Sequence, residues 1–304
     1  GVQPVPWLVA DGYIANYQEV LNALPLILVT SNWVKEMYVR DGINGDKIEV
    51  LPVGCDTDAF IPYSKDDPKI LAAREALGVS PDQLMILTVG GDAASKGAQA
   101  VMQALAIIDT KAPDWKYVCK VWPQPRTKLQ NLADLEMATH LGIEKNVTYA
   151  TNTSSRNFMP YLIGACDIYA APSRLEGFGM PQVEAGACGK PVIGIKAMGM
   201  LDTLIHGETA FLANVAQKIV VNQVTLCDEA GFEDKHRVAF KYPRTVDYRA
   251  SVHDIANYLM DLMTDKPLRE KMGKAARERV VENFDYRVVA KRFVHIMNEK
   301  LGIK

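Results

Sequence analysis

The stretch of sequence that decides the fold is residues 172–189, PSRLEGFGMPQVEAGACG. Glu176 follows a short apolar run, and Gly177 and Gly179 let the backbone approach a ligand closely. A proline suited to the first turn of a helix comes next, Glu184 lies one turn further on, and the last glycine suits a C-terminal cap. A helix that begins after glycines offers free N–H groups to an anion. We therefore expect an anion site that the two carboxylates flank.

Strands and helices alternate on both sides of this stretch. The apolar runs that predict strands are 84–90, 117–122, 147–150, 168–171, 191–195 and 210–212. Helical spacing of apolar residues predicts helices at 95–108, 126–141, 157–166 and 181–188. The alternation predicts an α/β fold, a Rossmann-like parallel sheet with helices on both faces. Ligands of such sheets bind beyond the carboxyl ends of the strands, so the loops there form the candidate site.

The two ends of the chain differ from this middle. Strands at 25–30 and 48–52, around a helix that starts at Ser31 or Asn32, predict a smaller α/β unit, followed by a turn-rich linker at 53–69. The C-terminal part is helical throughout, with helices expected at 252–263, 267–282 and 286–301. The segment 214–249 has no clean periodicity. We expect an insertion there that acts as a lid or as a surface for a partner.

The composition excludes several classes of protein. The chain has 304 residues, a formal net charge of −2 and a hydrophobic share of 48%, so it is not disordered and has no overall charge that favours nucleic acid. No apolar run reaches the roughly 18–20 residues of a membrane span, so we expect no transmembrane segment. The five cysteines form no CxxC pair and the five histidines are scattered. We expect no metal site, and a cytoplasmic location at the membrane surface or away from it.

Residues 172–189 resemble the E-x7-E signature of the retaining nucleotide-sugar glycosyltransferases of the GT-B fold, in glycosyltransferase family 4 (glycosyl transferases group 1). Residues 48–60 (IEVLPVGCDTDAF) are similar to the interdomain segment of that family, and 89–97 (VGGDAASKG) to its first phosphate-side loop. Residues 146–172 are similar to the strand–helix–strand that leads into the signature. The resemblance implies the C-terminal donor domain of a GT-B fold plus a truncated N-terminal α/β part.

The resemblance also implies a role for each residue of the site. Glu184 would hold the ribose hydroxyls of the donor, Glu176 would face the donor sugar, and Lys96 would neutralise the diphosphate as a point charge. Glu176 and Lys96 are thus the expected catalytic residues. The expected donor-binding residues are Gly90, Gly91, Lys96, Glu176, Gly177, Phe178, Gly179, Met180 and Glu184. The family implies no metal and no cofactor, only a nucleoside diphosphate sugar, UDP- or GDP-linked, as donor substrate.

One departure from the family concerns the diphosphate. Gly91 stands where the family usually has an arginine, the second cation for the leaving group. Either Arg156, Arg174 or Lys196 replaces it, or the stabilisation of the leaving group is weaker.

Other departures leave the donor sugar open. Residues 122–126 (WPQPR) replace a short Gly-rich loop, and residues 199–202 (GMLD) replace the usual Gly-Gly-x-x-Glu. Trp122 and Tyr149 could stack on a base or serve only as packing. Phe178 could line the site or belong to the core.

We expect a glycosyltransferase that moves a sugar from a nucleoside diphosphate donor to an acceptor (a sugar, a lipid or a small molecule) with retention of configuration. The alternatives are a nucleotide-sugar-binding module that is inactive alone, and an epimerase or phosphorylase of the same fold. The expected domains are 1–62, a remnant of the acceptor domain, 63–285, the donor domain with the insertion 214–249, and 286–304, a helix that packs back on the N-terminal part. About 60 residues are fewer than the 100 or so of a full domain, so we expect the front of the acceptor domain to be missing or supplied by a complementing fragment.

Overall fold

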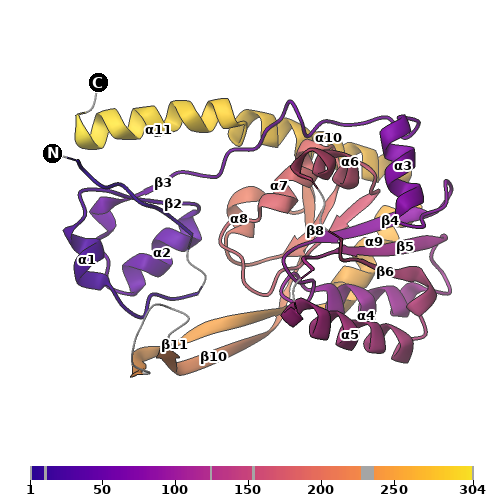
Figure 1. The fold of residues 1–304 in the computed structure, drawn as a ribbon, viewed down its shortest axis with the longest axis horizontal. Coiled ribbons are helices and arrows are strands. Elements are labelled where there is room, and N and C mark those ends of the chain that lie inside the picture. The colour runs from indigo at the N-terminus through magenta and orange to yellow at the C-terminus, as the bar shows by residue number, and fades with distance from the viewer. Residues whose placement is uncertain (1, 10–11, 124, 153–154, 227–235, 303–304) are drawn as a thin grey trace.

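The computed structural model describes residues 2–9, 12–123, 125–152, 155–226 and 236–302 (Figure 1). Its centre is a six-stranded sheet in the order β6-β5-β4-β7-β8-β9, in which all paired strands are parallel. The strands are β4 (Leu84–Val89), β5 (Trp115–Lys120), β6 (Val147–Ala150), β7 (Ile168–Ala170), β8 (Val192–Ile195) and β9 (Ala210–Ala213). The predicted α/β fold with a parallel sheet is therefore confirmed, although β5 lies two residues earlier than the sequence indicated.

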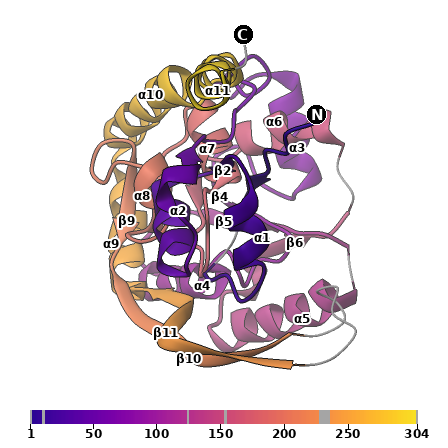
Figure 2. The same cartoon turned by 90° about the vertical axis from the view of Figure 1, so that its left-hand side faces the viewer.

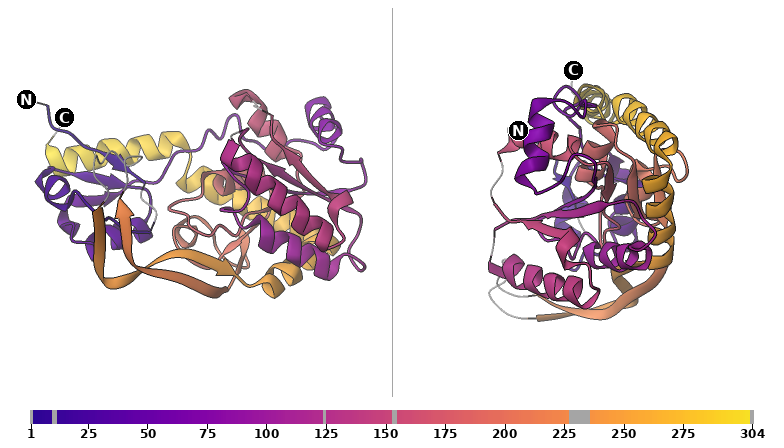
Figure 3. Two further views of the ribbon diagram at one scale, coloured as in Figure 1. Left: turned by 60° about the horizontal axis from the view of Figure 1, so that its bottom comes forward. Right: turned by 90° about the vertical axis from the view of Figure 1, so that its right-hand side faces the viewer.

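Helices cover both faces of this sheet (Figure 3). One face carries α4 (Ala98–Ile108), α5 (Pro125–His140) and α9 (Val252–Thr264), which pack against one another through α4. The other carries α3 (Pro68–Ala76), α6 (Met159–Gly164), α7 (Met180–Ala187) and α10 (Lys266–Asn283), each in contact with the next. The strands between these layers are apolar on both faces; Ile86, Leu87 and Ile168 have no exposed surface. Such continuous apolar runs are typical of buried parallel strands.

The strand order places the candidate site. The chain runs outward from β4 to β6 on one side and then returns to add β7, β8 and β9 on the other. The direction of winding reverses between β4 and β7, and ligands of doubly wound sheets bind at the carboxyl ends of the strands on either side of such a reversal. The loops after β4 and β7 are therefore the ones to examine.

A smaller N-terminal unit has its own parallel sheet, in the order β1 (Trp7–Leu8), β2 (Ile27–Val29) and β3 (Ile48–Val50). It also holds α1 (Gln18–Ala23) and α2 (Asn32–Arg40). Successive side chains along β2 point to opposite faces of the sheet, as in any strand, so they pack against different helices. Ile27 and Val29 pack toward α2, whereas Leu26 and Leu28 pack toward α11 (Tyr286–Leu301). The last helix thus lies against the N-terminal sheet, as Figures 1 and 2 also show.

Shorter elements complete the chain. They are α8 (Met200–Thr203) and the 3-10 helices η1 (Gly45–Lys47), η2 (Glu144–Asn146) and η3 (Arg156–Phe158). In the described parts of the chain no helix is long and apolar enough to cross a membrane. Four cysteines are buried free thiols (Cys55, Cys119, Cys166 and Cys188), while Cys227 lies outside the described residues.

The segment expected to be an insertion, for which the sequence shows no clean periodicity, is a long two-stranded ribbon. β10 (Val215–Leu226) pairs with β11 (His236–Ala250) in antiparallel register. Register shifts interrupt the pairing between Ile219 and Val220 and again between Val221 and Gln223. Because each shift reverses the alternation of side chains, the period of two that reveals a strand is lost from the sequence.

The ribbon reaches from the large sheet to the N-terminal unit, on the side opposite α11 (Figures 1 and 2). There Arg244 Nη2 pairs with Asp41 Oδ1 at 2.8 Å, and the side chains are only 8% and 1% exposed. The rings of Tyr13 and Phe240 also meet, with 5.2 Å between their centroids. The two units are therefore in contact along both the ribbon and the last helix.

Candidate active site

The loops after β4 and β7 touch each other at the edge of the large sheet. Gly97 has φ of +83°, and a Cβ there would lie 2.3 Å from the carbonyl oxygen of Pro172. Only glycine therefore permits this approach of the two loops. The N–H of Arg174 donates to the carbonyl of Ser95 at 2.8 Å and ties the loops together.

The two expected catalytic residues face each other across this junction. Lys96 Nζ lies 2.6 Å from Glu176 Oε2, and the side chains are 19% and 14% exposed. Ser173 Oγ donates to the same carboxylate oxygen at 3.2 Å. A partly buried ammonium–carboxylate pair is stronger than a surface pair because less water screens it. The site thus holds one cation beside one carboxylate, and an anion bound there could pair with Lys96 in place of Glu176.

The helix α7 begins directly after the glycines of the signature. Gly179 is its N-cap, with φ of +91° and no side-chain cap, and a proline occupies the first turn as predicted. The first N–H groups of α7 are consequently not claimed by a capping side chain. Phe178 points away from this end and meets Phe284 edge-on at 5.7 Å in the core. The ring therefore belongs mainly to the core, and it also borders a small cavity beside Ser31 and Asp202.

Glu184 lies one turn into α7 and is largely buried. Burial raises the pKa of its carboxyl from 4.5 to about 7, and the charge of Arg156 lowers it only in part. A buried carboxylate with so little compensation needs donors, and two hydroxyls of a ligand would supply them.

The structure separates the three cations that were considered in place of the missing arginine. Of the three cations, Arg156 is the one whose charge lowers the pKa of Glu184. Arg174 Nη2 instead donates to Gln99 Oε1 at 2.6 Å. Lys196 lines another cavity, together with residues of the ribbon and Trp33 of α2.

Gly91 lies beneath an aromatic ring. A Cβ built at Gly91 would lie 3.4 Å from the ring of Trp122. That ring also borders a mostly apolar cavity of about 710 Å³. The cavity is lined by Trp122, Pro123, Lys128, Asn131, Leu132, Leu135, Tyr149 and Thr151. Trp122 is 60% exposed and free to stack, whereas the Tyr149 hydroxyl donates to Asp134 at 2.8 Å.

The N-terminal unit supplies two residues to this region that the sequence did not reveal. Ser31 Oγ donates to the carbonyl of Gly177 at 2.6 Å, and Asn32 Nδ2 lies 2.5 Å from Asp202 Oδ1. The sequence indicated that Ser31 or Asn32 could cap a helix, and Ser31 does cap α2, but no local pattern shows a partner far along the chain. Among the described residues no group of three or more histidine, cysteine, aspartate or glutamate side chains is placed to hold a metal ion.

Proteins of known sequence resemble this chain over much of its length. The family model of the glycosyl transferases group 1 matches residues 70–223. A D-inositol 3-phosphate glycosyltransferase of Rhodococcus erythropolis is 26% identical over 77% of this chain and 54% of its own length. Its counterpart in Mycolicibacterium smegmatis is 28% identical over 81% of this chain and 56% of its own length. The chain therefore spans about half the length of these relatives.

Solved structures share the fold. Anabaena HepE in complex with UDP and glucose superposes with a TM-score of 0.73 and 19% identity, over 92% of this chain and 65% of HepE. A glycosyltransferase of Rickettsia africae gives a TM-score of 0.75 and 19% identity, over 99% of this chain and 71% of that one. The fold is thus that of the GT-B glycosyltransferases. Since the family model covers half of the chain, residues 70–223, this protein belongs to the glycosyl transferases group 1 family.

Proposed function

We propose that the protein transfers a sugar from a nucleoside diphosphate donor, UDP- or GDP-linked, to an acceptor with retention of configuration. The observation that carries this proposal is the pairing of Lys96 with Glu176 beside the uncapped start of α7. Both lie at the reversal of the sheet, and the family of the chain fits the same chemistry.

In this proposal the diphosphate lies between Lys96 and the N-terminus of α7. Its arrival draws the ammonium away from Glu176, which then accepts hydrogen bonds from the hydroxyls of the donor sugar. The bond from the sugar C1 to the diphosphate oxygen breaks, and its electron pair leaves with the diphosphate. Lys96 and the helix N-terminus stabilise this growing charge, an effect worth about 3–4 kcal/mol for one well-placed donor.

The acceptor oxygen forms the new bond to C1 on the face that the diphosphate leaves. Its proton passes to a diphosphate oxygen, so no separate base of the chain is needed. This geometry gives retention of configuration. We also propose that the reaction needs no metal, since the positive charge that the leaving group requires comes from the chain, and that it takes place in the cytoplasm, where the four free thiols would stay reduced.

The nucleoside has a separate place in the proposal. Its base lies in the cavity beside Trp122, whose exposed ring supplies a stacking surface. The ribose hydroxyls lie at Glu184, where ionisation of the buried carboxyl improves their binding. HepE, which has the same fold, binds UDP.

Calorimetric titration with UDP and GDP tests this function. We expect one of the two to bind with a dissociation constant below 1 mM, roughly −4 kcal/mol or better. Glu176→Gln should keep this affinity and lose the release of free sugar from the matching nucleotide sugar. EDTA should leave that release unchanged. Failure of both nucleotides to bind would overturn the proposal.

The acceptor is tested by a panel of hydroxyl compounds with the matching donor. Inositol 3-phosphate is the first to try, because the two relatives quoted above are named for it. We expect transfer only from the donor whose nucleotide binds in the titration.

A further inference from the structure

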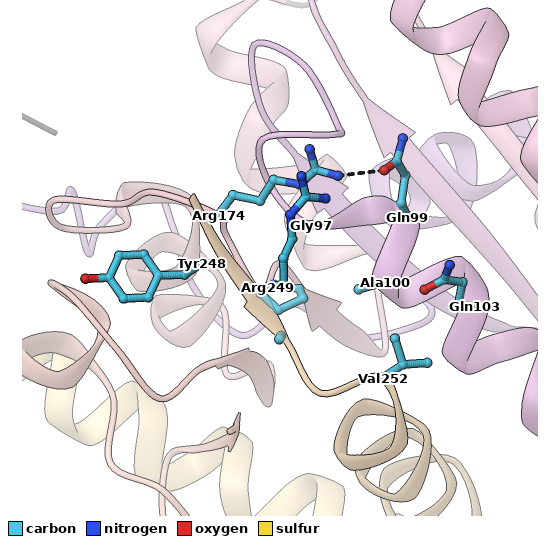
Figure 4. A pocket seen from close by; sticks show the side chains of 10 residues that line it. Gly97, Gln99, Ala100, Gln103, Arg174, Tyr248, Arg249 and Val252 are labelled. Atoms are coloured by element: carbon cyan, nitrogen blue, oxygen red, sulfur yellow. Dashed lines mark hydrogen bonds between the residues drawn. The ribbon is translucent and has the colours of Figure 1, made fainter. Parts of the chain in front are cut away.

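A further cavity lies between the start of α4 and the end of β11 (Figure 4). Its volume is about 210 Å³. It is lined by Gly97, Gln99, Ala100, Gln103, Pro172, Arg174, Tyr248, Arg249, Ala250 and Val252. Lys96, Glu176 and Glu184 are not among these residues, so the cavity is separate from the proposed donor site.

The lining of this cavity is positively charged. It includes two guanidinium groups, Arg174 and Arg249, and no carboxylate. The two groups lie next to each other in Figure 4. Burial lowers the pKa of Arg174, the charge of Arg249 lowers it further, and the carboxylates of Asp247, Asp134 and Asp92 offset this only in part.

The carboxylates that act on these two arginines lie outside the lining. Arg249 Nη2 pairs with Asp247 Oδ2 at 2.6 Å. Arg174 Nη2 donates to a neutral partner, Gln99 Oε1, at 2.6 Å. Arg249 Nε is buried and finds no hydrogen-bond acceptor in the described chain. A buried donor of a charged group is costly when unpaired, and Asp247 Oδ1 beside it is likewise buried without a hydrogen-bond partner among the described residues, so the existing pair leaves Arg249 Nε unsatisfied.

We propose that this cavity binds a single phosphate group, as inorganic phosphate or as a phosphomonoester. Guanidinium groups bind phosphate through paired N–H donors, and the donors here come from two arginines on different elements. The amide of Gln103, on the next turn of α4, offers a further donor. With less than a third of the volume of the cavity beside Trp122 (210 against 710 Å³), the site suits a phosphate group and not a nucleotide.

The position of Arg174 connects this phosphate site to the active-site loop. Its N–H donates to Ser95, and its carbonyl accepts from the N–H of Tyr248 at 2.8 Å. Glu176 follows two residues later. A phosphate held by Arg174 and Arg249 therefore fastens the ribbon to the loop that carries Glu176, and its binding should order both.

Calorimetric titration with inorganic phosphate, at constant ionic strength and with UDP present in excess, tests this site. We expect phosphate to bind despite UDP, and Arg249→Gln to weaken it about tenfold or more, since a hydrogen bond to a charged group is worth about 1.5–3 kcal/mol. Arg237→Gln, an exposed arginine of the same strand, should change the affinity less than twofold. Gln103→Ala should lower the affinity for phosphate without removing a charge. This variant takes the place of Arg249→Gln in the test if Arg249→Gln does not fold.

Titration with glycerol phosphate distinguishes the two sources of the phosphate group. Tighter binding than that of inorganic phosphate assigns the site to a phosphomonoester, and weaker binding assigns it to the free ion. Displacement of phosphate by UDP, or equal affinity in the wild type and in both cavity variants, would overturn the proposal. Phosphate binding is read directly, so it can succeed even if no nucleotide binds.

Discussion

The hydroxyl of Ser31 donates a hydrogen bond to the carbonyl of Gly177, 146 residues further along the chain. The same oxygen accepts the N–H of Val34 and caps α2 at 3.2 Å. One small side chain thus both starts a helix of the N-terminal unit and holds the glycine loop of the active site.

Replacing Ser31 by alanine removes both bonds. We expect Ser31→Ala to lower the free energy of unfolding by about 1–3 kcal/mol, the sum of a lost cap and a lost buried hydrogen bond. Urea denaturation measures this loss. Ser31→Thr keeps the hydroxyl and should recover most of the stability; a Ser31→Ala variant as stable as the wild type would show that the bond to Gly177 contributes nothing.

Glu184 predicts a pH dependence of stability. Its pKa in the folded protein is about 7, above its ordinary value of 4.5, so the folded state favours the protonated form. The resulting stabilisation is complete below pH 4.5 and is lost as the pH rises through 7. Glu184→Gln cannot ionise, so we expect it to be more stable than the wild type at pH 8, by on the order of 1–3 kcal/mol.

Denaturation of both proteins at pH 4 and pH 8 checks this prediction. The advantage of Glu184→Gln should nearly vanish at the lower pH. The same variant should bind UDP less well at pH 8, because the amide is a weaker acceptor for the ribose hydroxyls. An advantage in stability that is equal at both pH values would contradict the shifted pKa.

Lys96 should act on the diphosphate and not on the nucleoside. We expect Lys96→Ala to weaken UDP binding about 10- to 100-fold, the loss of one charge-assisted hydrogen bond, and to leave uridine binding unchanged. Calorimetry with both ligands measures the difference. Lys196→Ala is the matched control, since Lys196 lines a different cavity. Equal losses for UDP and uridine would place Lys96 elsewhere in the site.

The buried pair between Arg244 and Asp41 should fix the ribbon to the N-terminal unit. Removing one member of a buried pair typically costs about 3–5 kcal/mol when the other charge is left uncompensated, and we expect a smaller loss here because Asp41 also pairs with Arg40 Nη2 at 2.8 Å. We expect Arg244→Ala to detach the ribbon locally, with faster amide exchange along β11 and near Asp41. Hydrogen-exchange mass spectrometry measures this, with Arg237→Ala as a control on the same strand. Unchanged exchange in Arg244→Ala would mean that other contacts hold the ribbon.

The sequence predicts those elements whose periodicity is set by one buried face. The strand at 147–150 and the helix at 286–301 match β6 and α11 to the residue. The two strands of the ribbon were not predicted, because register shifts break the alternation of side chains on which a strand prediction depends. Local pattern is thus informative only where the hydrogen-bond register is regular.

The site was predictable to the same extent. Lys96 and Glu176 each follow a strand of one parallel sheet, so their loops had to meet at one edge, and they do. The bond from Ser31 and the pairing of Arg174 with Gln99 depend instead on how separate elements dock. No spacing in the sequence encodes such docking.

The ribbon and α11 hold the two units from opposite sides (Figure 1). The bonds from Ser31 to Gly177 and from Asn32 to Asp202 attach the units at a third place, so the two units can separate only by breaking contacts in more than one region. The strand β10 has 12 residues and is therefore about 40 Å long, at 3.3 Å per residue. The ribbon is thus long enough to cross from the large sheet to the N-terminal unit, where Arg244 meets Asp41.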